Sequence, residues 1–180
     1  MHLGADIIKC ALRLLALQPL KWHYFWGKCI AWIVRVPLRY RKDVVMINLA
    51  RSFPEKKYRE LEDIAVKFYG HLGRIIAETV WFAGSYIKNR LEDSGICHYS
   101  NLEALSELFD KAPSVMLMTS HAGNWEILGG CMHYRSLTRS GTFSFTEDEI
   151  SIVYKELSNK TMDRVMRHNR CTPVKADWST

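Results

Sequence analysis

The sequence lacks a long uninterrupted apolar run near its N-terminus. Between Leu12 and Val36 the longest stretch without a charged residue is about seven residues, whereas a membrane-spanning helix needs roughly 18 or more. The same recurring charges exclude a cleavable signal peptide, which requires an unbroken apolar core. A simple spanning helix is therefore not predicted, and we expect the protein on the cytoplasmic side.

Paired cysteines are also lacking. The five cysteines are scattered along the chain, and none of them forms a C-x-x-C pair. A disulfide framework needs an even set of cysteines and a zinc ribbon needs paired ones. We therefore expect reduced thiols.

Acidic residues are scarce in the first part of the chain. Residues 1–42 hold eight Lys or Arg but only one acid, Asp6, so this segment carries +7 and the remainder of the +6 total sums to −1. Such asymmetry indicates an acidic partner, either phospholipid headgroups or nucleic acid. Trp and Tyr stand among the basic residues, as they do at membrane interfaces. We expect a membrane surface as partner and no nucleic acid.

The basic residues recur every seven positions from Lys21 to Lys42. On a helix this spacing forms a stripe that drifts slowly round one side, with Trp, Phe and Ile on much of the rest. Pro19 and Pro37 would divide the segment. Residues 1–42 are thus predicted to be an amphipathic helical segment that lies in a membrane interface. A hairpin of buried helices with snorkelling Lys and Arg stems, or a spanning anchor that tolerates its charges, is the alternative.

Residues 43–180 form the second predicted region, which opens with a long helix. Ser52, Pro54 and Glu55 match the signal of a helix start, with an N-cap, a proline in the first turn and a third-position Glu. Apolar residues then keep an i, i+3, i+4 rhythm from Leu61 to Thr79. This rhythm predicts a helix of about five turns that packs one face on a core.

Beyond Asn101 the pattern changes to alternating strands and helices. Apolar strands without polar alternation, separated by helices, are typical of a sheet that is buried on both faces. We therefore predict an α/β fold, with a mixed or parallel β-sheet flanked by helices. The expected elements are a helix at 102–109, a strand at 115–118, a helix from Asn124, a strand at 150–154, a helix at 159–169 and a strand from Thr172. Because the chain stops after this last strand, we expect it to be the N-terminal part of a longer protein.

Candidate catalytic residues lie where the first apolar strand gives way to a helix. His121 and Glu126 are five positions apart, about 140° on an ideal helix, so they meet only if Ala122 and Gly123 form a bend before the helix. Glu126 would then orient one imidazole nitrogen while the other acts as a base towards a hydroxyl. Backbone N–H groups and Arg170 are candidate donors to a developing oxyanion. A purely structural contact between a strand-end His and a helix-start Glu is the alternative.

A metal site is not predicted. Cys131 and His133 together with His121 and Glu126 offer suitable ligand types. However, Cys131 and His133 point to different faces of a helix, so these four side chains do not converge.

Several stretches resemble one known family. The string H-A-G-N-W-E at 121–126 resembles the H-x-x-x-x-[DE] motif of the lysophospholipid acyltransferase superfamily, and its H-x-G-N-W-E form is similar to the bacterial lipid A biosynthesis acyltransferases, the lauroyl and myristoyl transferase group. Further similar stretches are R-Y-R-K at 39–42, N-L-A-R-S-F-P-E at 48–55, F-Y-G-H-L at 68–72, V-Y-K-E-L-S-N-K at 153–160 and R-H-N-R at 167–170.

This resemblance implies transfer of a fatty acyl group from acyl carrier protein, or from coenzyme A, to a hydroxyl of a lipid A precursor. It implies a glycerolipid acyltransferase-like fold and a place at the cytoplasmic face of the inner membrane in lipopolysaccharide biosynthesis, with no cofactor or metal. His121 would be the base, Glu126 its partner and Arg170 a ligand for phosphate or for the developing charge. Gly123, Asn124 and Trp125 would contact the substrate. The family's chains continue further, with an acidic motif that contributes to the site.

Two other functions stay open at this stage. One is a membrane-surface module that binds anionic lipid without chemistry, which the +7 segment by itself would serve. The other is an esterase or thioesterase that uses His121 and Glu126 to activate water.

Overall fold

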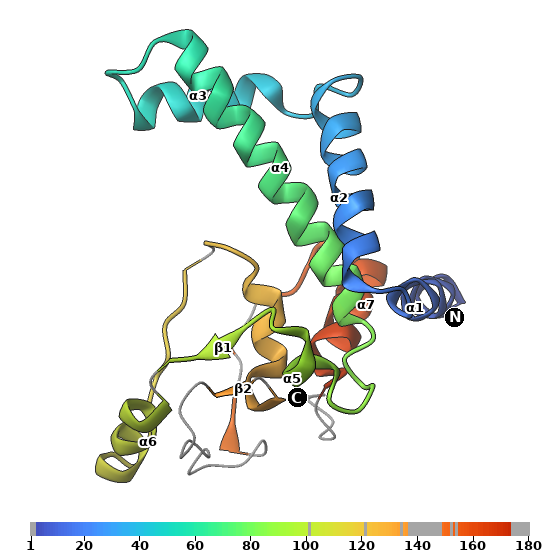
Figure 1. The fold of residues 1–180 in the computed structure, drawn as a ribbon, viewed down its shortest axis with the longest axis vertical. Coiled ribbons are helices and arrows are strands. Elements are labelled where there is room, and N and C mark those ends of the chain that lie inside the picture. Colours follow the sequence, from blue (N-terminus) through green and yellow to red (C-terminus); the bar gives the residue numbers. More distant parts are fainter. Residues whose placement is uncertain are drawn as a thin grey trace. The chain divides into compact units, whose positions relative to one another are not determined.

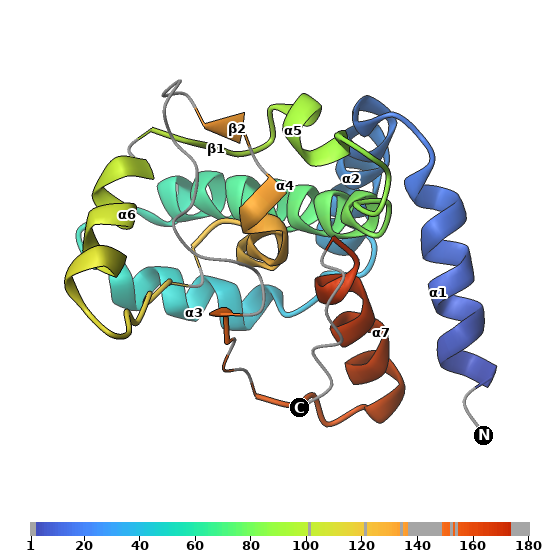
Figure 2. The ribbon, with the colours of Figure 1, turned by 90° about the horizontal axis from the view of Figure 1, so that it is seen from below.

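The computed structural model describes residues 3–100, 102–120, 122–133, 135–136, 149–151, 153 and 155–173. Its residues form two compact units, one of Gln18–Trp81 and the other of Met1–Leu17 with Phe82–Thr180. Each unit is described by itself below (Figures 1 and 2).

The unit of residues 18–81 consists of helices. Pro19 is the N-cap of α2 (Leu20–Arg35), the first helix of this unit, and its fixed φ angle suits a helix start. Pro37 follows the end of the same helix. The predicted interruptions at both prolines are thereby confirmed. The helices are α2 (Leu20–Arg35), α3 (Lys42–Ser52) and α4 (Tyr58–Phe82), of which α4 reaches one residue beyond the unit.

Helices α2 and α4 lie side by side (Figure 1) and cross through small residues. A Cβ added to Gly27 would lie 2.6 Å from the carbonyl oxygen of Gly73 and 3.0 Å from the Cβ of Ala77. A Cβ added to Gly73 would overlap the carbonyl of Gly27 and lie 2.9 Å from the Cβ of Ala31. The two backbones therefore touch, and only glycine fits at this crossing.

Two tyrosines join elements of this unit through their hydroxyl groups. Tyr24 of α2 donates to Oε1 of the buried Glu78 of α4 at 3.0 Å. Burial, and then the negative charge of Glu78, raise the pKa of Tyr24 to about 12. Tyr69 of α4 donates to the carbonyl oxygen of Tyr40 at 2.7 Å. This second bond fixes the turn between α2 and α3 to α4.

That turn contains unusual backbone. Arg39 and Arg41 have φ angles of +46° and +53°, in the left-handed region that side chains with a Cβ rarely adopt. Each such residue costs on the order of 1–2 kcal/mol. The turn therefore keeps its shape only because its surroundings enforce it.

The second unit combines α1 with the chain after α4. Its largest fully buried side chains are those of Phe82, Leu91 and Val165. Arg90 donates to the carbonyl of Ala16 at the end of α1. The elements are α1 (Leu3–Ala16), α5 (Arg90–Ser94), β1 (His98–Tyr99), α6 (Leu102–Lys111), the 3₁₀ helix η1 (Trp125–His133), β2 (Arg135–Ser136) and α7 (Lys160–Cys171).

The predicted α/β fold with a mixed or parallel β-sheet flanked by helices is wrong. Among the described residues the only β pairing joins His98–Tyr99 to Arg135–Ser136. The predicted strand at 115–118 has no ladder partner and is exposed, with Met116 at 86% and Met118 at 90%. Residues 151 and 153 are not strand either. An apolar run marks a segment suited to a strand, but a strand forms only where a second segment supplies its hydrogen bonds. Much of the strand predicted from Thr172 lies outside the described residues.

The predicted helices are largely confirmed, with one wrong boundary. The rhythm from 61 to 79 lies inside α4, and the helices predicted at 102–109 and 159–169 are α6 and α7. Ser52, however, ends α3 instead of opening α4. The α4 start is stabilised by Glu60, whose carboxylate accepts from the Lys57 N–H at 2.9 Å, a half of the capping-box arrangement.

No helix in the described part of the chain combines the length and the apolar character required to span a membrane.

Candidate active site

A bend opens the segment that carries the predicted catalytic residues. Gly123 has a φ of +72°, a left-handed conformation that glycine adopts without steric cost. Helix η1 begins two residues later at Trp125. The bend that a contact between His121 and Glu126 would require is present at Gly123. His121 lies outside the described residues, so its hydrogen bond to Glu126 stays a prediction.

Glu126 lies in the first turn of η1 and forms a two-pronged ion pair with Arg170, in the last turn of α7. Nε of Arg170 donates to Oε2 at 2.6 Å, and Nη2 donates to Oε1 at 2.7 Å. The side chains are only 12% and 15% exposed. Parallel charged hydrogen bonds of this kind are strong and fix the orientation of both groups.

Two further contacts hold Arg170 against η1. Its guanidinium lies 4.8 Å from the ring centre of Trp125, a favourable cation–π distance. A Cβ on Gly129 would lie 2.6 Å from the carbonyl oxygen of Arg170, so glycine permits the close approach of η1 and α7. Glu126 is therefore held by a rigid contact between two helices.

The start of α7 is capped by Asn159. Its side-chain oxygen accepts from the N–H groups of Thr161 and Met162 at 3.0 and 3.1 Å, as an N-cap does. Next to it, the buried Asp163 accepts from the Leu157 N–H at 2.8 Å. These bonds fix α7, and with it Arg170.

The chemistry available to Glu126 follows from its lone pairs. Each carboxylate oxygen can accept two hydrogen bonds, and the two bonds from Arg170 use one site on each oxygen. The carboxylate thus retains capacity to accept from an imidazole N–H. Arg170, in turn, directs Nε and Nη2 at Glu126, which differs from the phosphate or oxyanion contact that the resemblance implied for it.

The other predicted site residues fall into the same short segment. Gly123 forms the bend, Asn124 precedes η1 and Trp125 begins it. Sequence reasoning missed the ion pair between Glu126 and Arg170 and the role of Gly129. A glycine inside a helical pattern was the available signal for Gly129, since it often marks a close approach. Glu126 and Arg170 are 44 positions apart, and no local pattern in the sequence indicated their ion pair.

A metal ligand set is not formed by the described residues, where no group of three or more His, Cys, Asp or Glu side chains converges. The side chains of His121, Cys131 and His133 lie outside this description.

Comparison with protein families places the chain in an acyltransferase class. Residues 4–172 match the family model for bacterial lipid A biosynthesis acyltransferase. The chain belongs to this family, which confirms the resemblance seen in the sequence and assigns the protein an acyltransferase role in lipid A biosynthesis. Comparisons with curated proteins and with solved structures found no match.

Proposed function

We propose that this acyltransferase moves a fatty acyl group from a thioester of acyl carrier protein, or of coenzyme A, to a hydroxyl of a lipid A precursor. The membership of residues 4–172 in the family supports this reaction. The observation that carries the site concerns Glu126, which lies five positions after His121. Arg170 binds both oxygens of the Glu126 carboxylate.

His121 takes the proton of the acceptor hydroxyl while the hydroxyl oxygen attacks the carbonyl carbon of the thioester. The carbon–sulfur bond then breaks, and the proton passes to the departing sulfur. Glu126 orients the imidazole, and Arg170 keeps Glu126 in place. Gly123, Asn124 and Trp125 line the approach of the substrate.

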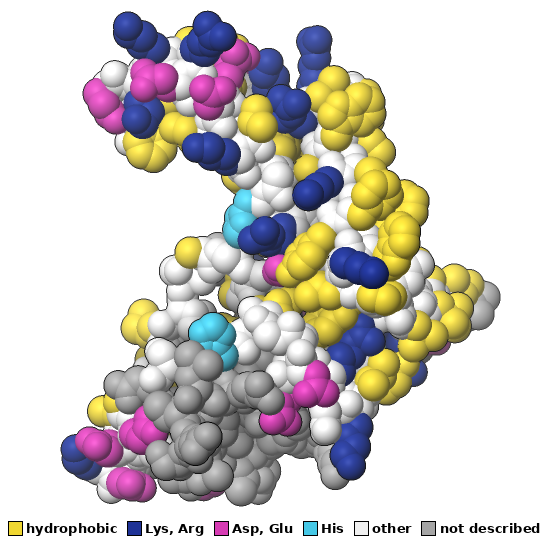
Figure 3. Space-filling model, in the orientation of Figure 1, with side chains coloured by type: hydrophobic (Ala, Val, Ile, Leu, Met, Phe, Trp, Pro, Cys, Tyr) yellow, Lys and Arg dark blue, Asp and Glu magenta, His cyan; other side chains and the backbone are white. Residues whose placement is uncertain are grey.

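The reaction takes place at the cytoplasmic face of the inner membrane, and the outer face of α2 supports this location. Trp22, Trp26 and Ile33 are all about half exposed on one side, whereas the buried Gly27 and Ala31 lie on the other. Figure 3 shows hydrophobic side chains gathered along α2, interrupted by Lys and Arg. Aromatic and basic residues together suit the boundary between headgroups and acyl chains.

The experiment supplies lauroyl acyl carrier protein and a lipid A precursor and measures acylated lipid. A His121→Ala variant should be slower by about 10²–10⁴-fold, the usual contribution of a general base. His71→Ala, which removes an exposed histidine of α4, is the control and should retain full activity.

Three outcomes would contradict the proposal. Normal turnover by His121→Ala would exclude the base. Release of free fatty acid without acylated lipid would instead identify a thioesterase. Vesicle binding without any acyl transfer would identify a lipid-binding module.

A further inference from the structure

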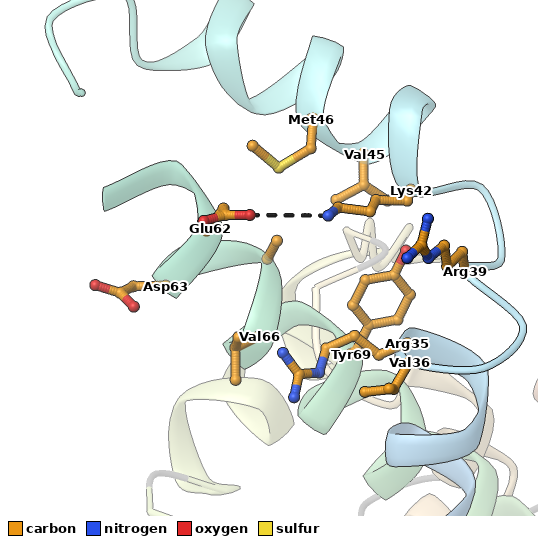
Figure 4. Close-up of a pocket in the computed structure, with 11 residues that line it drawn as sticks. Arg35, Val36, Arg39, Lys42, Val45, Met46, Glu62, Asp63, Val66 and Tyr69 are labelled. Atoms are coloured by element: carbon orange, nitrogen blue, oxygen red, sulfur yellow. Dashed lines mark ion pairs between the residues drawn. The ribbon is translucent and has the colours of Figure 1, made fainter. Parts of the chain in front are cut away.

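A cavity of about 370 Å³ lies within the helical unit of residues 18–81. Its lining comes from the end of α2, the turn that follows, the first turns of α3 and the adjoining part of α4 (Figure 4). Three cations, Arg35, Arg39 and Lys42, line it together with apolar side chains that include Val36 and Val66. A second cavity of about 550 Å³ shares Arg39 and Lys42. None of the residues assigned to acyl transfer lines either cavity.

Glu62 and Asp63 also line the first cavity, so its three cations face two carboxylates and the lining keeps a net charge of +1. Within the described part of the chain, neither Arg35 nor Arg39 forms a salt bridge. Lys42 lies 3.7 Å from Glu62, and both side chains are more than 40% exposed, so this pair contributes little. The Asp63 carboxylate points away from the two arginines in Figure 4. An anion that enters the cavity therefore meets cations without strong partners.

The turn that carries Arg39 is also fixed next to α4. The Tyr69 ring lies between the guanidinium groups of Arg35 and Arg39 in Figure 4, and Tyr69 is almost fully buried. Its hydroxyl ties the turn to α4 through the Tyr40 carbonyl. The left-handed backbone of Arg39 is enforced by these surroundings, and strained backbone of this kind is concentrated at ligand sites.

We propose that this cavity binds the phosphate group of a small amphiphile. Guanidinium groups match the geometry of phosphate oxygens, and an ammonium group adds a third charged donor. Val36, Met46 and Val66 form apolar walls for the hydrocarbon next to the phosphate. The volume falls within the range of small-molecule sites.

Calorimetric titration of the 180-residue chain with dihexanoyl phosphatidic acid, below its micelle concentration, tests the site without a membrane surface. The Arg35→Gln/Arg39→Gln variant should bind about tenfold more weakly or worse, because two charged donors are lost. Arg59→Gln/Lys67→Gln removes the same charge from exposed positions of α4. This control should change the dissociation constant by less than about twofold, as expected of screened surface charge.

A Val66→Trp variant fills the cavity and keeps every charge, so it too should weaken binding while circular dichroism shows an intact helical fold. Inorganic phosphate is titrated in parallel. If it binds as tightly and with the same dependence on the two arginines, the site holds and its ligand is free phosphate. Equal weakening by both double variants, unchanged binding by Val66→Trp, or no binding of either ligand by the wild type would overturn the proposal.

Discussion

The helical unit of residues 18–81 and the segment around Glu126 are held together in different ways. In the helical unit, α2 and α4 touch through the backbones of Gly27 and Gly73. Around Glu126, the contacts are a charged pair to Arg170, a ring stacked on that arginine and a side-chain helix cap. The helical unit is therefore distinguished by a double backbone contact, and the region around Glu126 by a buried charged pair, which the close approach at Gly129 accompanies.

The comparison teaches which changes each region tolerates. A backbone crossing leaves no room for one additional methyl group but is indifferent to charge. A charged pair does not tolerate the loss of one partner, and at Gly129 the approach of η1 to α7 also leaves no room for a Cβ. Loss of a charge at Glu126 or Arg170 should therefore affect that region and leave the crossing of α2 and α4 intact.

The largest effect is expected from Gly73→Ala. The new methyl group would overlap the Gly27 carbonyl, and a backbone group cannot rotate aside. We expect a loss of about 2–3 kcal/mol in the free energy of unfolding, measured by urea denaturation. Gly70→Ala in the same helix meets no atom within 4 Å and should gain about 0.5–1 kcal/mol from helix propensity. The same sign for both substitutions would show that α2 and α4 do not cross at Gly73.

A smaller effect is expected from Arg170→Ala. Glu126 would lose both of its charged donors in a site that is largely shielded from water, at a cost of about 2 kcal/mol. Arg164→Ala, an exposed position of the same helix, should change stability by less than about 0.5 kcal/mol. A double-mutant cycle with Glu126→Ala should return a coupling energy of about 1–2 kcal/mol. Additive effects would contradict the ion pair.

The smallest effect concerns pH and the contact of α1 with α7. Nη2 of Arg13 donates to Nε2 of His168 at 3.0 Å, so this nitrogen carries no proton. Burial, then the charges of Arg13 and Lys9, lower the pKa of His168 below 6.5. Because the unfolded chain protonates first, the contribution of His168 is full above pH 6.5 and is lost as pH falls towards the lowered pKa.

The test compares the unfolding free energies of wild type and His168→Gln between pH 7.5 and 5. The advantage of the wild type should shrink as the pH falls. A difference that stays constant over this range would rule out titration of His168 in the folded protein.

The sequence predicted helices well because helix hydrogen bonds are local. The rhythm between Leu61 and Thr79 located α4, and Pro19 located the start of α2. The start predicted for α4 at Ser52 was wrong. Ser52, Pro54 and Glu55 match the pattern of a helix start, but Ser52 completes the last turn of α3. Local signals of this kind identify a helix more securely than its first residue.

The strands and the ion pair could not be predicted in the same way. The run at 115–118 has the composition of a buried strand, but strand formation depends on a partner elsewhere in the chain. By contrast, the bend at Gly123 was indicated by the residue type alone. The pairing of Glu126 with Arg170 depends on how η1 meets α7, which no local pattern contains.

The crossing of α2 and α4 has a consequence for the medium in which this helix pair is stable. Gly27 with Ala31 on α2, and Gly73 with Ala77 on α4, form two small-xxx-small patterns that face each other. Attraction across such a crossing comes from close van der Waals contact, which does not require water to be expelled and works equally among acyl chains. Because the small residues do the packing, the large aromatic side chains of α2 remain on its outer side. The pair should therefore keep its geometry whether that side faces water or lipid.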